Sequence, residues 1–226
     1  MLAHPEGCIT LTSDGQVRLY SRSGSFREIA GGASAVAQDK GEILVATERQ
    51  ILIFNRSGEQ IDKVKADIGA SAILRTTDAL VVGFREGTID IIRRDRDHSA
   101  SSLSLQEAPS SPIVTLLQGP MGTLVVGFAN GLLGLWDMKN GTRLFATNFH
   151  GPVVHTLMRG GKLYAASELG DHQVMDLRAF EISYCDLVRE VWRSVPAVWE
   201  DGLPVKREPP WDHSCAAAVG RKPRVR

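Results

Sequence analysis

Short apolar runs separated by tight turns are the main hydrophobic pattern of this chain. The clearest example has one run at Leu124–Val126 and a second at Leu132–Trp136, with Asn130-Gly131 between them. Asn-Gly accepts the positive φ angles that a tight hairpin turn needs. The pattern therefore predicts two short antiparallel β-strands.

The same pattern recurs about every 40 residues, which is a period seen in propeller blades. Further copies begin near Ile9, Ile43, Leu80 and Leu163. When the copies are aligned on their turns, one apolar position in the second strand of this two-strand pattern falls at Leu19, Ile53, Ile91, Leu135 and Val174. The sequence therefore predicts an all-β fold, a β-propeller of about five degenerate blades.

The predicted propeller covers residues 1–182, with blades at about 1–32, 33–68, 69–109, 110–151 and 152–182. The first blade is expected to be partial, because Leu2-Ala3 leaves little room for its innermost strand. Turns are expected at Arg56–Glu59 and at Gly160-Gly161, and a long mobile loop at Arg93–Ser102.

Residues 183–226 follow a different pattern and are expected to form a C-terminal helix, a hairpin and a basic tail. Ser183 followed by Asp186 is typical of a helix N-terminus, and Pro196 is expected to end the helix. Asp201-Gly202 predicts a small hairpin. Residues 207–226 are rich in proline and then basic, which predicts a frayed terminus.

Residues 133–177 resemble a WD-repeat. They contain a strand that ends in Trp136-Asp137, a turn at Lys139–Gly141, a further strand and then His150-Gly151. The resemblance covers about residues 1–180 and implies a WD-type propeller, although the other copies lack the Trp-Asp pair.

In that family a His, a Ser, an Asp and a Trp form a structural hydrogen-bond network. The fifth copy has His150, Ser167 and Asp171, but Met175 stands at the Trp position. We therefore expect His150 to make a polar contact in a loop and Trp136 to be a packing residue.

The resemblance also implies that the turns between second and third strands surround the central channel on one face. That face is a common docking surface in the family. The candidate partner-binding residues on these turns are Asp14, Arg49, Arg85, Glu86, Asn130 and Glu168. Simple solvation also explains polar turn residues, so both interpretations stay open.

The charge balance argues against a general nucleic-acid or membrane-surface role. The chain has 26 basic and 26 acidic residues and a formal net charge of +0, whereas binding to polyanions favours a basic excess. The signs alternate in Arg93–His98, and the basic run Arg221–Arg226 is expected to make only weak contacts. No apolar run approaches the roughly 20 residues needed to span a bilayer.

The three cysteines, Cys8, Cys185 and Cys215, are odd in number and widely spaced. This favours a reducing, cytoplasmic location over a disulfide framework. Cys185, Cys215 and His213 are too few and too widely spaced for a structural zinc site, so no metal is expected. His155 is expected to be a core residue on the first strand of the fifth blade.

The sequence contains none of the common catalytic or phosphate-binding motifs. We therefore expect no enzyme activity and no cofactor. The expected function is a protein–protein interaction scaffold or sensor, for example the C-terminal regulatory propeller of a larger signalling protein, with a protein or peptide partner. The alternative is a propeller enzyme or small-ligand binder with its site at the mouth of the central channel.

Five blades, one of them partial, leave the closure of the propeller open. Unpaired blade edges tend to pair with other chains, so self-association through these edges is expected if the ring does not close. The chain can be part of a longer propeller, close as a small ring completed by its tail, or assemble with a second chain.

Overall fold

The computed structural model describes residues 2–5, 7–93, 100–195, 197–206 and 214–215. Its contacts divide the chain into two compact units, Met1–Met175 and Asp176–Arg226. The sequence pattern changes slightly later, at residue 183, where the first turn of the predicted helix begins.

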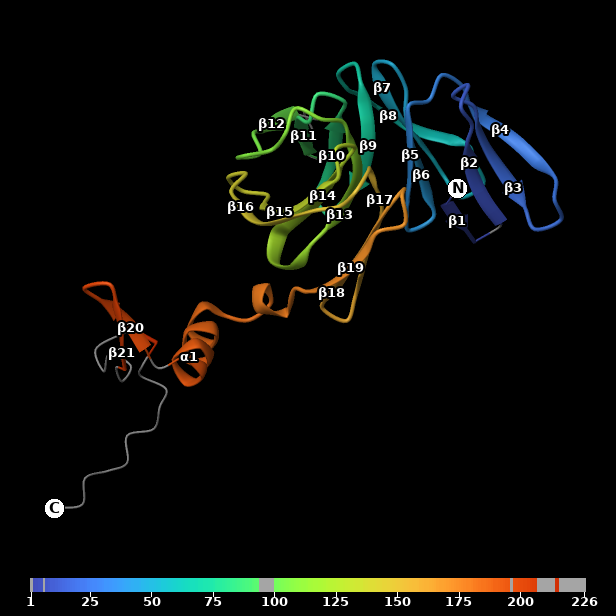
Figure 1. Ribbon diagram of the computed structural model, residues 1–226. Coiled ribbons are helices and arrows are strands. Elements are labelled where there is room, and N and C mark those ends of the chain that lie inside the picture. The colour runs from blue at the N-terminus through green and yellow to red at the C-terminus, as the bar shows by residue number, and fades with distance from the viewer. Residues whose placement is uncertain (1, 6, 94–99, 196, 207–213, 216–226) are drawn as a thin grey trace. The chain divides into compact units, whose positions relative to one another are not determined.

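The first unit consists of five small antiparallel sheets in which strands consecutive in the sequence lie side by side (Figure 1). The sheets are arranged as the blades of a five-bladed β-propeller, so the predicted all-β fold is confirmed. The strands are β1 (Leu2–His4), β2 (Gly7–Leu11), β3 (Val17–Ser21) and β4 (Phe26–Ala30) in the first blade; β5 (Ala35–Asp39), β6 (Glu42–Ala46), β7 (Gln50–Phe54) and β8 (Gln60–Lys65) in the second; β9 (Ala70–Arg75), β10 (Ala79–Phe84), β11 (Ile89–Arg93) and β12 (Ala100–Leu103) in the third; β13 (Ile113–Gln118), β14 (Thr123–Phe128), β15 (Leu132–Asp137) and β16 (Arg143–Asn148) in the fourth; and β17 (Val153–Arg159), β18 (Lys162–Ser167) and β19 (His172–Asp176) in the fifth.

The second strand of a blade explains why the apolar runs of the sequence are continuous rather than alternating. All six residues of β10 and all six of β14 are buried. Both faces of such a strand are covered, because a blade packs between two neighbouring blades. The fourth strands β4, β8 and β16 are much more exposed, since β8 has one buried residue and β4 and β16 have none.

The hydrophobic core lies between the blades. Ile9 and Leu19 of the first blade pack with Ile43 of the second. Ile89 and Ile91 of the third blade likewise belong to one cluster with Trp136 of the fourth. Each blade is therefore stabilised chiefly by its neighbours, as expected for a repeat architecture.

The predicted turns at Arg56–Glu59 and Gly160-Gly161 are confirmed, since they connect β7 to β8 and β17 to β18. The first blade does have a short innermost strand, β1, with three residues. The prediction of a long loop at Arg93–Ser102 is wrong at both ends of that range, because Arg93 is the last residue of β11 and residues 100–102 belong to β12. The ladder between β11 and β12 pairs Asp90 with Ser102, so small polar residues continue the sheet. Residues 94–99 lie outside the described residues.

The second unit contains a short 3-10 helix (Arg178–Phe180), helix α1 (Tyr184–Ser194) and a hairpin of β20 (Ala197–Glu200) and β21 (Leu203–Lys206). The Ser183 side chain accepts a hydrogen bond from the Asp186 backbone N–H at 3.2 Å, which confirms the predicted N-cap. Asp201 and Gly202 both have positive φ, as a tight hairpin turn requires. Pro196 and the basic run at 221–226 lie outside the described residues.

The expectation that the cysteines are not paired by a disulfide is wrong. Cys185 on α1 and Cys215 form a disulfide, with their Cα atoms 4.9 Å apart. The two residues are 30 positions apart in the sequence, and only the fold of this unit brings them together. Cys8 has a free thiol, and His213 lies outside the described residues.

Candidate functional site

The predicted partner-binding residues occupy equivalent turns of the five blades. Asp14 lies between β2 and β3, Arg49 between β6 and β7, and Arg85 with Glu86 between β10 and β11. Asn130 and Glu168 lie in the corresponding turns of the fourth and fifth blades. Because the blades share one up-and-down topology, these turns lie at the same end of the propeller, which we call the turn face.

The turn face is built from backbone contacts rather than from loose loops. The Arg85 N–H donates to the Gly69 carbonyl at 3.0 Å, and the Glu168 N–H donates to the Pro152 carbonyl at 2.9 Å. The Asn130 side-chain oxygen accepts from the Leu132 N–H at 3.1 Å. These contacts fix the turns, and they give Asn130 a structural role as well as an exposed position.

A hollow of about 410 Å³ on the turn face brings two of the predicted residues together. Asp14 and Arg85 both line it, with Glu48 beside them. The Thr12 hydroxyl donates to the Asp14 carboxylate and lowers the pKa of that group. Asp14 therefore stays ionised in a hollow that Arg85 also lines.

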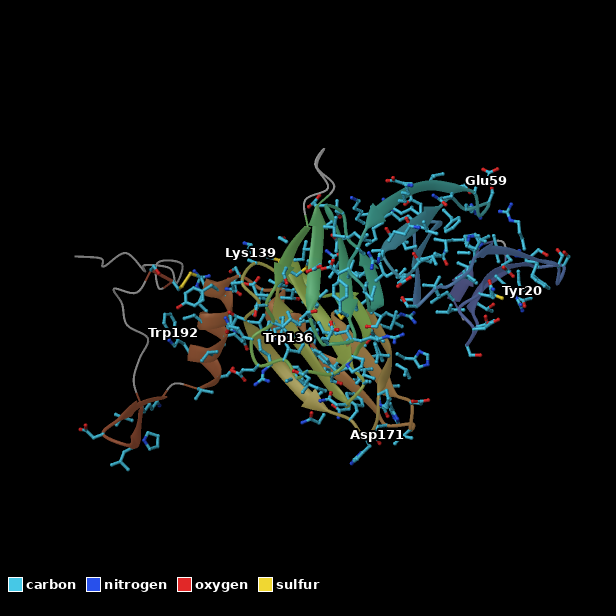
Figure 2. The ribbon with its side chains drawn as sticks, turned by 90° about the horizontal axis from the view of Figure 1, so that it is seen from above. Tyr20, Glu59, Trp136, Lys139, Asp171 and Trp192 are labelled. Carbon is cyan, nitrogen blue, oxygen red and sulfur yellow. A yellow bond between two sulfur atoms is a disulfide. The ribbon has the colours of Figure 1, made fainter. Side chains whose placement is uncertain are left out.

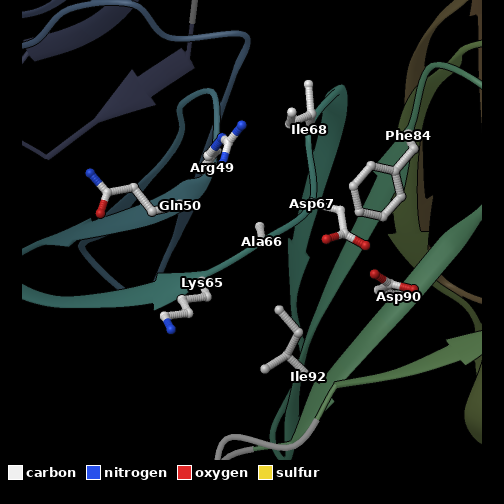
Figure 3. A pocket seen from close by; sticks show the side chains of 9 residues that line it. All are labelled: Arg49, Gln50, Lys65, Ala66, Asp67, Ile68, Phe84, Asp90 and Ile92. Atoms are coloured by element: carbon white, nitrogen blue, oxygen red, sulfur yellow. The ribbon is translucent and has the colours of Figure 1, made fainter.

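Arg49 lines a second hollow, of about 650 Å³, which the sequence did not predict. This hollow, the interblade hollow, lies between the second and third blades and contains four charged side chains (Figure 3). Its lining residues are Arg49, Gln50, Lys65, Ala66, Asp67, Ile68, Phe84, Asp90 and Ile92. One signal was present in the sequence, because Asp90 interrupts the apolar run from Ile89 to Ile92.

The central channel has a volume of about 610 Å³ and is lined by the first strands of all five blades. His155 on β17 lines it and is exposed, so the expectation of a core histidine is wrong. His155 lies two residues before Leu157 on β17, so the two side chains are on the same face of the strand. Within the part of the chain that the structure describes, no three His, Cys, Asp or Glu residues form a metal-binding group.

The interpretation of Trp136 as a packing residue is confirmed. Trp136 lies within the fourth blade (Figure 2) and is fully buried. Its ring meets the Phe128 ring edge-on, with 5.9 Å between the ring centroids, and its Nε1–H donates to the Gln106 carbonyl at 3.0 Å. His150 makes the expected loop contact, since its Nδ1 lies 2.6 Å from Asp171 Oδ2. The Asp171 N–H donates to Ser167 Oγ at 3.2 Å, so His150, Asp171 and Ser167 are joined by hydrogen bonds.

Within the described residues, the fifth blade has three strands where the others have four, so no described strand pairs with the outer edge of β19, which we call the free edge. It also differs at the aligned apolar position of the third strand. Leu19, Ile53, Ile91 and Leu135 are 8%, 6%, 8% and 1% exposed, whereas Val174 is 55% exposed. Leu157 on β17 is paired with Tyr164 on β18, so their side chains lie side by side on one face of the sheet, and they are 58% and 39% exposed. We call Leu157, Tyr164 and Val174 the apolar row of the fifth blade.

These features define the chain as a five-bladed β-propeller protein with two candidate docking regions, the turn face and the free edge of the fifth blade. No protein-family profile matches the chain. No curated protein matches it either. No helix in the described ranges is long and apolar enough to cross a membrane.

Many solved structures are similar to it, including the following two. One is the computationally designed Ika4 protein, with 19% identity and a TM-score of 0.51 over 64% of this chain and 91% of the Ika4 chain. The other is a chain of the mitotic checkpoint complex, with 14% identity and a TM-score of 0.59 over 73% of this chain. The match spans 57% of that second chain. At these identities the likeness shows the fold alone.

Proposed function

We propose that this chain is a non-catalytic protein-interaction platform of the WD-repeat type, and that a protein partner adds an extended strand to the free edge of β19. The observation that carries the proposal is the apolar row, in which Val174 is exposed while the equivalent residues of the other four blades, Leu19, Ile53, Ile91 and Leu135, are buried. Apolar residues grouped on a surface favour contact with another protein. The balanced charge supports a protein partner over a nucleic acid.

The direction of the backbone groups supports strand addition. The Ser167 N–H donates to the Asp171 carbonyl at 2.8 Å, so Asp171 faces β18. Residues along a strand face alternate sides of a ladder, so His172 and Val174 direct their N–H and C=O groups to the free edge. An extended peptide can satisfy these groups by adding a strand.

The fourth blade shows what chemistry the added strand needs. There, Leu133 pairs with Thr147 and Leu135 pairs with Phe145 on β16. The residues of the fifth blade at these places are His172 and Val174. The partner strand should therefore alternate, with an apolar residue opposite Val174 and polar residues facing water.

The turn face provides a second docking region, whose charged residues can select the partner. A scaffold or sensor role in signalling fits a platform with two such regions. Self-association is the variant of this proposal in which a second copy provides the strand. Light scattering distinguishes a different protein partner from a second copy of this chain. If the wild-type protein is a dimer and Val174→Pro is a monomer, the strand is provided by a second copy.

The test uses a fluorescent peptide with the sequence of residues 142–149, which includes β16, and the full chain. We expect a saturable rise in anisotropy with the wild-type protein. Val174→Pro should abolish it, because proline removes an edge N–H without touching the ladder to β18. Val174→Thr keeps that N–H and should retain binding. Equal binding by Val174→Pro and wild type would refute strand addition.

A further inference from the structure

The interblade hollow has two walls of opposite charge. Figure 3 shows Asp67 and Asp90 with their carboxylates close to each other on the side of the third blade, and Arg49 and Lys65 on the side of the second. Among the described residues, no ion pair is formed by Arg49, Lys65, Asp67 or Asp90. The charges that line this hollow are thus available to a ligand.

Burial and, to a smaller extent, the neighbouring charge of Asp67 make the ionised form of Asp90 unfavourable in the free protein. Burial raises the pKa of Asp90, the Ser102 hydroxyl partly offsets this, and the charge of Asp67 raises it further. A cation between Asp67 and Asp90 would remove this repulsion and compensate for the lost solvation. The chemistry of this wall therefore selects a positively charged group.

The floor of the hollow is apolar. Phe84 and Ile92 are buried, and Ile68 is exposed at the rim. A long side chain with an apolar stem and a charged end can cover this floor while its end reaches the acidic wall. Arginine fits best among side chains, because its planar guanidinium has enough donors to bond two carboxylates at once.

We propose that the interblade hollow is a receptor for an arginine side chain of a partner protein, with the guanidinium between Asp67 and Asp90. Acidic residues that flank this arginine in the partner would face Arg49 and Lys65. The proposal deepens the proposed function, since it names the chemistry of a partner segment. It concerns a site separate from the edge of β19, so either can fail alone.

The experiment is an NMR titration of the 15N-labelled full chain with the peptide acetyl-Gly-Ala-Arg-Ala-Gly-amide. The probe is compared with the same peptide containing citrulline, which has nearly the shape of arginine but no charge. We expect saturable shifts of the backbone amides of residues 66–68 and 90–92 with the arginine peptide. The citrulline peptide should bind about tenfold more weakly or worse, because hydrogen bonds to charged groups are the stronger ones.

Three variants test the assignment. Asp67→Asn and Asp90→Asn should each weaken arginine binding about tenfold, whereas Asp90→Glu should retain much of it. Asp62→Asn removes one exposed charge from the same region, on β8, and should leave binding unchanged. Val174→Pro should also leave it unchanged, which separates this site from the strand-binding edge.

The proposal is overturned if the citrulline peptide shifts the same amides with the same affinity. It is also overturned if Asp62→Asn weakens binding as much as Asp90→Asn, or if the shifts lie elsewhere in the protein. The comparison of the two peptides needs only the wild-type chain, so it holds even where a variant folds poorly.

Discussion

The fourth and fifth blades share one sequence pattern but not one environment. Leu135 on β15 and Val174 on β19 occupy the aligned apolar position, and the first is buried while the second is half exposed. The fourth blade has a fourth strand, β16, and a neighbour on each side. The difference teaches that burial in a propeller is set by what packs on a blade, so an uncovered blade is a place for another chain.

The largest expected effect is the difference in the free energy of unfolding between substitutions at the two residues of this aligned position, Leu135 and Val174. Leu135→Ala should lower the free energy of unfolding by about 2–5 kcal/mol, because it leaves a cavity in a packed core. Val174→Ala should change it by less than about 0.5 kcal/mol, as for other exposed positions. Urea denaturation of both variants measures the contrast. Similar losses would show that the face of the fifth blade is covered in solution.

The fourth and fifth blades can also be compared at one glycine in the equivalent hairpin turn of each blade. Gly131 and Gly170 both have positive φ, but a Cβ on Gly131 would lie 2.2 Å from the Phe149 carbonyl oxygen, whereas Gly170 has open space. Gly170→Ala should cost only the backbone strain of about 1–2 kcal/mol, and Gly131→Ala about 3 kcal/mol or more. Thermal and urea unfolding test this order, and equal losses would contradict the packing difference between the two turns.

The sequence predicted the blades well because their signals are local. Gly131 and its counterparts fix the turns, and continuous apolar strands such as β14 define the middle of each blade. It missed what depends on distant residues. The pairing of Cys185 with Cys215, the exposure of Val174 and His155, and the meeting of Asp67 with Asp90 all arise from how separate segments come together.

The six turn-face residues show the same limit. Their polarity marks them as turns, yet polarity cannot say which of them share a hollow. Asp14 and Arg85 do, whereas Arg49 faces a different group that includes Lys65 and Asp90. Neighbouring blades contribute to both hollows, so no single repeat carries the information.

The smallest expected effect concerns the hydrogen bonds between His150 and Asp171 at the turn of the fifth blade. The backbone N–H and the ring of His150 bond the Asp171 carboxylate and lower its pKa below the usual 3.8. Since the folded-state pKa is the lower one, this stabilisation is present above pH 4 or so and is lost as the pH falls through the folded value.

Asp171→Asn should therefore lower the urea midpoint slightly at pH 7, and the difference from wild type should vanish at low pH. The exposed Asp62→Asn variant is the control for loss of one negative charge. A difference from wild type that persists at a pH below the folded-state pKa of Asp171 would contradict the assigned contact between His150 and Asp171.

The most direct test of the account is amide hydrogen exchange on β15 and β19, with and without the peptide of residues 142–149. We predict that the His172 and Val174 amides exchange much faster than those of Leu133 and Leu135 in the free protein, and that the peptide slows them. Gln173 should be protected throughout, because it faces β18. If His172 and Val174 are already as protected as Leu133 and Leu135, or if the peptide leaves their exchange unchanged, the edge of the fifth blade is not a strand-binding site.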